Sequence, residues 1–430
     1  MMKLFPHQEA ALNATDGQNR VAYYLDMGLG KTFVGAEKAV RMDCKNILVV
    51  CQKSKVQDWI NHFEEHYTSW VFDLTTKEGL EEFLWYSDAT PNSIAGSQMK
   101  IGVINYDLIW RRKLILNLKN FTLVLDESSL IQNTKRSRCK FILQLNPSNV
   151  ILLSGTPTGG KYENLWSQLH LLGWNIGEKI YDAHYVNYKK IRVGLDVHKV
   201  VDKDNPYKNV ERLKQKMRDH GAVFMKTEEV FDLPEQNFIQ INVPVTKEYL
   251  KFKRDRLITI DGFEFVGDSL LSYRLYKRQL CTAFNQNKIE AFRDLLDSTQ
   301  DRLIVFYCFN CELDALYKVC KELNRPVSIV NGLTKDLTAY EEETNSVTFV
   351  QYQAGAMGLN LQKSNKIVYF SLTEESELFE QSKKRIHRIG QNRPCFYYLL
   401  ICKNSIEDEE ILPTLNVRKE LTDDLFEETT

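Results

Sequence analysis

The chain has 430 residues, of which 43% are hydrophobic and 26% charged, and its formal net charge is −1. This length exceeds what a single hydrophobic core organises, so we expect two or three domains. A charge near zero excludes a wholly basic protein, so any nucleic-acid surface must be a local patch. The sequence has no apolar stretch long enough for a membrane span, and nine cysteines without dense pairing favour a cytoplasmic location.

A short polar motif, Phe5-Pro-His-Gln8, precedes the first strand candidate. The amide of Gln8 has a donor side and an acceptor side, so it can read the donor–acceptor edge of adenine. A polar residue that starts a helix explains Gln8 equally well when the motif is taken alone. The loop that follows it favours adenine recognition.

A glycine-rich loop, Asp26-Met-Gly-Leu-Gly-Lys-Thr32, follows a strand candidate at residues 21–24 and opens a helical pattern over 33–41. Its glycines allow backbone N–H groups to close around phosphates at the start of that helix. Lys31 is expected to reach the β- and γ-phosphates of ATP, and the Thr32 hydroxyl to bind Mg²⁺. A plain helix cap is the alternative, and the strand–loop–helix context disfavours it. The predicted ATP-binding residues of this loop are Gly28, Leu29, Gly30, Lys31 and Thr32.

Further apolar runs with few polar residues recur through the first half, and each is typical of a strand buried on both faces of a parallel sheet. Helical patterns separate them, such as residues 56–67, where Ile60 and Phe63 lie among charged residues. This alternation predicts a doubly wound α/β domain. The runs are at residues 47–50, 101–104, 122–125 and 150–153.

Two motifs end strands of this half. Asp126 and Glu127 follow one strand directly, and we expect Asp126 to hold Mg²⁺ and Glu127 to orient the attacking water as a base. An Asp-Glu pair is a weak signal alone, but together with the phosphate loop it supplies a second metal anchor and a base. Ser154-Gly-Thr-Pro157 ends the next strand; its hydroxyls are suited to sensing the nucleotide, although a simple turn also explains this motif.

Residues 160 to about 295 contain few strand patterns and are predicted to be mostly helical. They carry three basic clusters, around residues 208–218, 247–256 and 274–278. Each cluster is consistent with contacts to DNA phosphates, and equally with a solvated helix face balanced by nearby carboxylates.

The strand–helix rhythm returns in the second half, which predicts a second α/β lobe. A loop of small residues, Gln353 to Leu361, follows one of its strands and permits close backbone approach to phosphates, either of a nucleotide or of a polynucleotide. Gly358 in this loop is predicted to contact ATP. The strand candidates are at residues 303–307, 327–330, 347–350, 367–370 and 396–401.

Near the end of the chain, residues 381–391 read Gln-Ser-Lys-Lys-Arg-Ile-His-Arg-Ile-Gly-Gln. If they form a helix, Gln381, Arg385 and Arg388 share one face. Guanidinium groups grip phosphate oxygens in pairs, so the two arginines are predicted to stabilise the charge that develops during ATP hydrolysis, with Gln381 as an ATP contact. A solvated basic helix would be the better explanation if no phosphate loop lay upstream.

The fold class predicted from these patterns is α/β, with two RecA-like, doubly wound parallel-sheet lobes and a mostly helical insertion between them. Residues 1–235 are expected to form lobe 1, including the helical insertion from about residue 160. Residues 236–295 are expected to form a helical linker, and residues 296–430 lobe 2 with an acidic tail.

These motifs together resemble helicase superfamily 2, and two of them are similar to the Swi/Snf-type branch of DNA-dependent ATPases, in a compact bacterial or phage-like form. The resemblance covers nearly the whole chain and implies an ATP-driven motor that tracks along double-stranded DNA. The motifs that carry it are Phe5-Pro-His-Gln8, Asp26-Met-Gly-Leu-Gly-Lys-Thr32, Asp126-Glu127, Ser154-Gly-Thr-Pro157, Ala354-Gly-Ala-Met-Gly-Leu-Asn-Leu361 and Arg385-Ile-His-Arg-Ile-Gly-Gln391.

By position, the resemblance also implies a DNA-facing set and a catalytic set. The chain departs from the family pattern at Ser128-Ser129, where the family has Ala-His or a close variant. Coupling of ATP hydrolysis through that imidazole is therefore not expected here. The residues implied to face DNA are Lys53, Ser54, Asn105, Tyr106, Thr156, Phe309, Asn310, Gly355 and Asn360. The catalytic residues are Lys31, Asp126, Glu127, Arg385 and Arg388.

The function expected from the sequence is an ATP- and Mg²⁺-dependent translocase on double-stranded DNA that hydrolyses ATP between two lobes and remodels or displaces nucleoprotein complexes. We expect a monomer as the motor unit. Two alternatives stay open: a helicase that separates DNA or RNA strands, and an ATP-gated DNA-binding module with little turnover.

Overall fold

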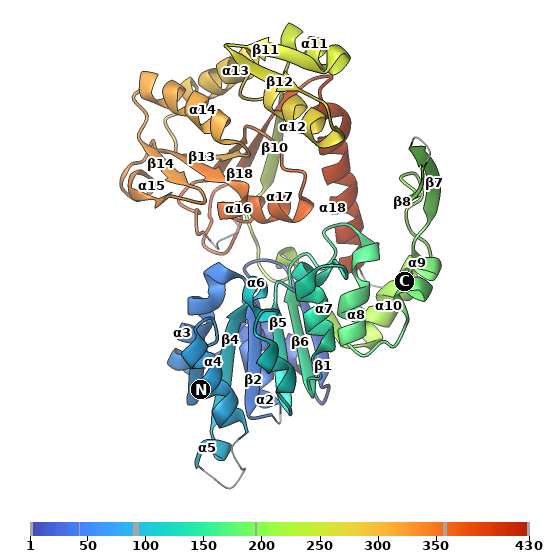
Figure 1. Ribbon diagram of the computed structural model, residues 1–430. Helices are drawn as coiled ribbons and strands as arrows, with labels where there is room; N and C mark the ends of the chain where they lie inside the picture. The colour runs from blue at the N-terminus through green and yellow to red at the C-terminus, as the bar shows by residue number, and fades with distance from the viewer. Residues whose placement is uncertain (1–2, 43, 89–93, 194–195, 356–358, 428–430) are drawn as a thin grey trace. The chain divides into compact units, whose positions relative to one another are not determined.

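The computed structural model describes residues 3–42, 44–88, 94–193, 196–355 and 359–427. The chain divides into two compact units, of which unit 1 contains Met1–Val230 and Leu421–Thr430, and unit 2 contains Phe231–Glu420. Each unit is built around one seven-stranded sheet (Figure 1).

The sheet of unit 1 has the strand order β3-β4-β2-β5-β6-β1-β9, and all its strand pairs are parallel. Its central strands are buried along their whole length, as their almost purely apolar sequences predict. The bounds are β1 Arg20–Leu25, β2 Asn46–Cys51, β3 Ser69–Asp73, β4 Met99–Asn105, β5 Phe121–Asp126, β6 Asn149–Ser154 and β9 Ala222–Met225.

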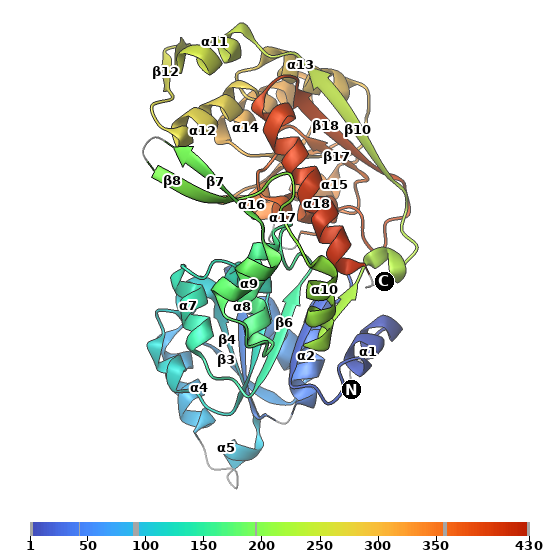
Figure 2. The same ribbon diagram turned by 90° about the vertical axis from the view of Figure 1, so that its right-hand side faces the viewer.

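Helices cover both faces of this sheet, with α4 and α7 on one side and α2 on the other (Figure 2). The pattern predicted at residues 56–67 is confirmed as α3, which buries Ile60 and Phe63. The bounds are α1 Pro6–Asn13, α2 Lys31–Arg41, α3 Val56–His66, α4 Lys77–Ser87, α5 Ile94–Ser97, α6 Tyr106–Ile109, α7 Ser137–Gln144, α8 Trp166–Leu171, α9 Glu178–Tyr185 and α10 Val210–Asp219.

The sheet of unit 2 has the order β10-β18-β17-β13-β16-β14-β15 and is parallel except for the short edge pair β14–β15. Its strands are β10 Gln236–Val243, β13 Leu303–Tyr307, β14 Val327–Val330, β15 Lys335–Asp336, β16 Val347–Gln351, β17 Lys366–Tyr369 and β18 Cys395–Cys402. Its helices are α11 Lys247–Asp255, α12 Leu270–Leu280, α13 Gln286–Asp297, α14 Asn310–Glu322, α15 Thr338–Glu342, α16 Tyr352–Gly355, α17 Ser376–Lys383 and α18 Leu412–Phe426, whose last residues belong to unit 1.

Two parallel-sheet lobes confirm the predicted fold class, but the segment from residue 160 to 295 holds more strands than expected. It contributes β9 and β10 to the edges of the two sheets. β9 has only four residues, all apolar, and β10 mixes polar with apolar residues and is mostly exposed or half-exposed, so neither resembles the buried central strands. It also forms two separate hairpins, β7–β8 (Tyr188–Val193 and Asp196–Val201) and β11–β12 (Leu257–Ile260 and Phe263–Val266). Residues 236–295 are therefore part of unit 2 and not a linker.

The acidic end of the chain also differs from its predicted place as a tail of the second lobe. Leu425 and Phe426 lie in the hydrophobic core of unit 1. The Tyr162 hydroxyl donates to Asp424 Oδ2 at 2.9 Å, and the buried Lys214 ammonium lies 3.1 Å from Asp424 Oδ1. The prediction of a tail was wrong because it was based on the acidic residues, whereas the apolar residues Leu425 and Phe426 bind this segment to unit 1.

Within the described residues, no helix combines the length and the apolar character that crossing a bilayer requires.

Candidate functional site

The glycine-rich loop connects β1 to α2 at the carboxyl edge of the unit 1 sheet, where ligands of open α/β sheets bind. Gly28 and Gly30 both have positive φ, +92° and +76°. The left-handed conformation of Gly30 favours glycine, and a Cβ atom there would lie 2.2 Å from Gln8 Nε2 and displace that amide. Gly30 is the N-cap of α2 and no side chain caps the helix, which leaves its first N–H groups facing an anion site.

Gln8 lies beside this loop, and its amide makes hydrogen bonds within the protein. Its Oε1 accepts from the Phe5 N–H at 2.9 Å and closes the first turn of α1, while its Nε2 donates to Leu29 O at 3.2 Å. The side chain is 3% exposed. In this structure Gln8 therefore holds the phosphate loop, and its contact with adenine stays a prediction.

Lys31 extends from the start of α2 to the ends of two neighbouring strands. Its Nζ donates to Leu25 O, at the end of β1, at 3.0 Å. A Cβ atom at Gly155 would lie 3.3 Å from the same Nζ, so the absence of a side chain at Gly155 makes room for the ammonium. The Lys31 ammonium thus lies beside Gly155, in the segment that follows β6.

The start of the loop is held by a residue that the sequence did not reveal. Asp26 accepts the Met27 N–H at 2.9 Å through Oδ1, and its Oδ2 accepts the Thr227 hydroxyl at 2.8 Å. Thr227 follows β9, some 200 residues along the chain, and is buried. No local pattern marks it, because only the pairing of β9 with β1 brings it here.

Asp126 ends the buried strand β5. Its Oδ2 accepts the Trp59 indole N–H at 2.9 Å, and its backbone oxygen accepts the Tyr106 hydroxyl at 2.9 Å. Burial raises the pKa of the Asp126 carboxyl above its ordinary 3.8, while the Trp59 hydrogen bond and the charge of Lys31 act in the opposite direction. The carboxylate is therefore poorly solvated and lies within electrostatic reach of the phosphate loop.

This donor set fits a magnesium ion. Mg²⁺ prefers oxygen ligands, and Thr32 and Asp126 supply a hydroxyl and a buried carboxylate whose anionic form a cation would stabilise. Glu127 follows with φ +54° and ψ +60°, a left-handed conformation that is uncommon for a non-glycine residue. Such strain at the end of a central strand is typical of functional sites.

A buried amide links the Asp126–Glu127 segment to the Ser154–Pro157 segment. Gln168 on α8 accepts hydrogen bonds through Oε1 from the Ser128 hydroxyl at 2.8 Å and the Tyr24 hydroxyl at 3.1 Å. Its Nε2 donates to Pro157 O at 2.7 Å. Ser128 is one of the two residues that differ from the family motif, and its hydrogen-bond partner, Gln168, could not be identified from the sequence.

The predicted helix over residues 381–391 is wrong beyond Lys383, where α17 ends, so Gln381, Arg385 and Arg388 do not share a helical face. A turn follows, because the Gln391 amide binds the backbone oxygens of Ser364 and Gln362, at 2.9 and 3.1 Å, and pulls the chain back.

The two arginines of this turn are largely withdrawn from solvent. Arg385 is 2% exposed and its guanidinium reaches Leu359 O at 3.5 Å. Burial lowers the pKa of the Arg388 guanidinium. Gly358 lies outside the described residues.

The residues implied to face DNA divide into two groups. Asn105, Tyr106 and Gly355 are buried, and the Tyr106 hydroxyl donates to the backbone oxygen of Asp126, so their contact with DNA stays a prediction. The exposed or half-exposed residues are Lys53, Ser54, Thr156, Phe309, Asn310 and Asn360.

All three basic clusters contain cations that are paired with carboxylates. In the 208–218 cluster Lys214 lies 3.0 Å from Glu211 and Lys216 lies 3.2 Å from Asp219. Lys253 lies 3.0 Å from Glu409, and Lys277 lies 3.4 Å from Glu410, which also binds Arg274. These contacts favour the explanation of a balanced helix face for those cations.

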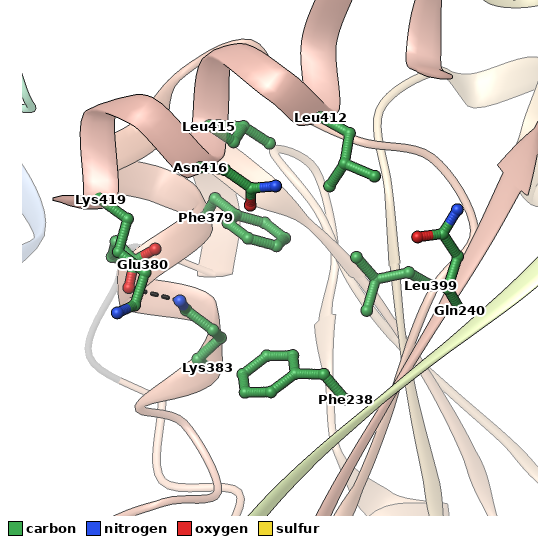
Figure 3. Close-up of a pocket in the computed structure, with 10 residues that line it drawn as sticks. All are labelled: Phe238, Gln240, Phe379, Glu380, Lys383, Leu399, Leu412, Leu415, Asn416 and Lys419. Carbon is green, nitrogen blue, oxygen red and sulfur yellow. Dashed lines mark ion pairs between the residues drawn. The ribbon is translucent and has the colours of Figure 1, made fainter. Parts of the chain in front are cut away.

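Unit 2 also contains a pocket of about 410 Å³ between β10, β18, α17 and α18 (Figure 3). Its lining is mainly apolar, with the Lys383–Glu380 ion pair at one side. The Lys383 ammonium lies 5.1 Å from the ring centre of Phe379 and 5.6 Å from that of Phe238. None of the predicted site residues lines it.

Comparisons with known proteins agree with these motifs. A family model described as SNF2-related domain matches residues 24–283. A Xenopus tropicalis protein named SWI/SNF-related matrix-associated actin-dependent regulator of chromatin subfamily A-like protein 1 is 24% identical over 428 residues, covering 94% of this chain and 43% of that protein. A Mycoplasma genitalium protein named an uncharacterized ATP-dependent helicase is 23% identical over 428 residues, covering 92% of this chain and 39% of that protein.

The chain therefore spans about two fifths of the length of these curated relatives. Among solved structures, the Sulfolobus solfataricus SWI2/SNF2 ATPase core in complex with dsDNA matches with a TM-score of 0.45 and 18% identity. That match covers 99% of this chain and 93% of the other.

Proposed function

The chain belongs to the SNF2-related family of DNA-dependent ATPases, and from this premise we propose that it is an ATP-driven translocase on double-stranded DNA. One observation carries the proposal: the left-handed glycine loop at the uncapped start of α2 places Lys31 within electrostatic reach of Asp126. A phosphate cradle, a cation and a buried carboxylate at one sheet edge are what ATP hydrolysis needs.

In the proposed reaction the N–H groups at the start of α2 hold the ATP phosphates, and Lys31 exchanges Leu25 O for a phosphate oxygen. Glu127 orients the attacking water and takes its proton. Thr32 and Asp126 hold Mg²⁺, which when bound offsets the negative charge on the β- and γ-phosphate oxygens.

From unit 2 we assign the positive charge that completes hydrolysis to Arg385 and Arg388, with Gln381 and Gly358 as further ATP contacts. Support comes from the chemistry of the guanidinium group, which stabilises charge best where water is excluded. Arg385 is 2% exposed, so its charge is largely desolvated. The proposal that ATP is hydrolysed between two lobes rests on these residues.

The polymer substrate we propose is duplex DNA, contacted by the exposed residues of the DNA-facing set, Lys53, Ser54, Asn310 and Asn360 among them. Relatives named as regulators of chromatin support displacement of proteins from DNA as the outcome of movement. We propose a monomeric motor, and a cytoplasmic location in keeping with nine cysteines that are all free thiols.

The test is ATP hydrolysis by the full chain in the presence of double-stranded, single-stranded and forked DNA and of RNA, beside displacement of a triplex-forming strand. We expect duplex DNA to stimulate hydrolysis most, triplex displacement to require ATP, and Lys31→Ala to abolish both. DNA-stimulated hydrolysis that persists in Lys31→Ala contradicts the proposed ATP site. No DNA-stimulated hydrolysis at all contradicts the proposed motor and leaves an ATP-gated binding module.

A strand-separating helicase is the second candidate, favoured by the Mycoplasma genitalium relative named a helicase. Unwinding of a forked duplex without triplex displacement would select it.

A further inference from the structure

The β7–β8 hairpin projects from the body of unit 1 (Figures 1 and 2) and forms a two-stranded sheet of its own. Nearly all of its described side chains are exposed. A two-stranded ribbon without a covered face has little stability of its own, so packing alone does not explain it.

The strand register separates the hairpin into two chemically different faces. Tyr188, Lys190 and Arg192 of β7 lie on one face, opposite Val201, Lys199 and Val197 of β8. We call the set Tyr188, Lys190, Arg192 and Lys199 the basic face. It carries three cations and, within the two strands, no carboxylate.

On the other face the charges are already balanced. Lys189 binds Asp202 and Asp204, both at 2.7 Å. Among the described residues, by contrast, no ion pair is made by Lys190, Arg192 or Lys199. Asp202 and Asp204 are thus paired with the lysine that points away from the basic face, and Asp196 of β8 also lies on that other face.

Two features of the basic face indicate an anionic ligand. Lys190 and Lys199 are directly opposed across the strands, and like charges in that position destabilise a strand pair unless an anion lies between them. The Lys199 ammonium also lies 3.7 Å from the centre of the Tyr188 ring, which holds it on this face. Asp182 on α9 is a carboxylate near this face, and after burial its charge is the main cause that raises the pKa of the Tyr188 hydroxyl.

We propose that the basic face of the β7–β8 hairpin binds the phosphate backbone of double-stranded DNA, as a second contact beside the ATP-dependent track. This inference rests on the proposed function, because it takes DNA as the polymer. A two-stranded ribbon fits the major groove of B-DNA. A strand advances roughly 3.4 Å per residue and each DNA strand carries one phosphate per roughly 3.4 Å of axis, so Lys190 and Arg192 reach separate phosphates.

The test compares two double variants of the full chain that each remove two positive charges from unit 1. Lys190→Gln/Arg192→Gln alters the basic face. Lys45→Gln/Lys119→Gln is the matched control, because both lysines are exposed and precede β2 and β5, at the sheet edge away from the nucleotide loop. Binding to a 30-base-pair duplex is measured by fluorescence anisotropy over a range of salt concentrations.

We expect the basic-face variant to lower the slope of log affinity against log salt by about 1.8, since each phosphate contact contributes about 0.9. At 0.1 M salt its affinity should fall about 10- to 60-fold on the same reasoning. The control should keep the affinity and slope of the unaltered protein. Thermal melting should be unchanged or slightly raised in the basic-face variant, which excludes unfolding as the cause.

The outcomes separate the two proposals. If the unaltered protein does not bind the duplex, or the duplex does not stimulate its ATP hydrolysis, the proposed function fails. If it binds and is stimulated but the basic-face variant keeps its affinity and salt slope, the hairpin inference alone is overturned and an acidic protein segment becomes the ligand to test.

Discussion

Gln168 provides the sharpest test of how unit 1 holds the segment after Asp126 and the Ser154–Pro157 segment together. Its side chain is fully buried and accepts two hydroxyl donors, Ser128 and Tyr24, while donating to Pro157 O. The substitution Gln168→Leu keeps most of the volume and removes all three hydrogen bonds. We expect it to destabilise unit 1 and to slow ATP turnover.

The expected loss in free energy of unfolding follows from the two hydroxyl groups that lose their hydrogen-bond acceptor. Ser128 and Tyr24 are each 0% exposed, so their hydroxyls cannot turn to water. Two buried hydroxyls at about 1–3 kcal/mol each cost about 2–6 kcal/mol. Pro157 O keeps the Gln132 amide at 3.2 Å, and leucine retains apolar contacts, so we expect a net loss of about 2–4 kcal/mol.

Urea unfolding followed by tryptophan fluorescence measures this loss, because all six tryptophans lie between residues 59 and 174, in unit 1. Gln132→Leu is the matched control: it removes the other amide on Pro157 O from a half-exposed position and should cost about 1 kcal/mol or less. Adding Ser128→Ala to Gln168→Leu removes one unpaired hydroxyl and should restore about 1 kcal/mol.

The reasoning is refuted if Gln168→Leu lies within about 0.5 kcal/mol of the unaltered protein, the range of ordinary surface substitutions. It is also refuted if Ser128→Ala costs as much in the Gln168→Leu background as it does alone.

Three further predictions concern other parts of the chain. Asp126→Asn should abolish ATP hydrolysis yet stabilise nucleotide-free unit 1 by about 0.5–2 kcal/mol in urea unfolding at pH 7. Because the pKa of Asp126 is raised above 3.8 in the folded protein, the unaltered protein loses stability relative to this variant as the pH rises from 3.8 through the raised pKa. A stability difference between the two proteins that is the same at pH 4 and pH 7 would contradict a raised pKa as the cause. Phe426→Ala, at a 9% exposed anchor of the C-terminal segment, should cost about 3–5 kcal/mol by the same fluorescence assay, and no loss would make that segment a free tail after all. Lys288→Met should destabilise unit 2 by about 3–5 kcal/mol in calorimetry, because it leaves the buried Glu407 without its ammonium partner at 2.6 Å; the double variant Lys288→Met/Glu407→Leu should recover most of this loss.

The strand–helix alternation was predicted correctly because each strand and helix occupies a few consecutive residues, and backbone geometry turns such patterns directly into structure. The glycine-rich loop and the Asp126–Glu127 pair do lie at the ends of the predicted strands, and their catalytic roles stay predictions. The helix expected over residues 381–391 failed because the distant Ser364 and Gln362 oxygens bind Gln391.

Periodicity and short motifs encode the two α/β lobes, the glycine-rich loop and the family resemblance locally, so all three can be predicted from the order of the residues. Three other features are visible only in the folded chain: Thr227 anchors Asp26, Gln168 joins Ser128 to Pro157, and the acidic C-terminal end packs into unit 1. All three have one cause. These contacts join residues tens to hundreds of positions apart, and their partners are chosen by sheet order and burial, which no local pattern records.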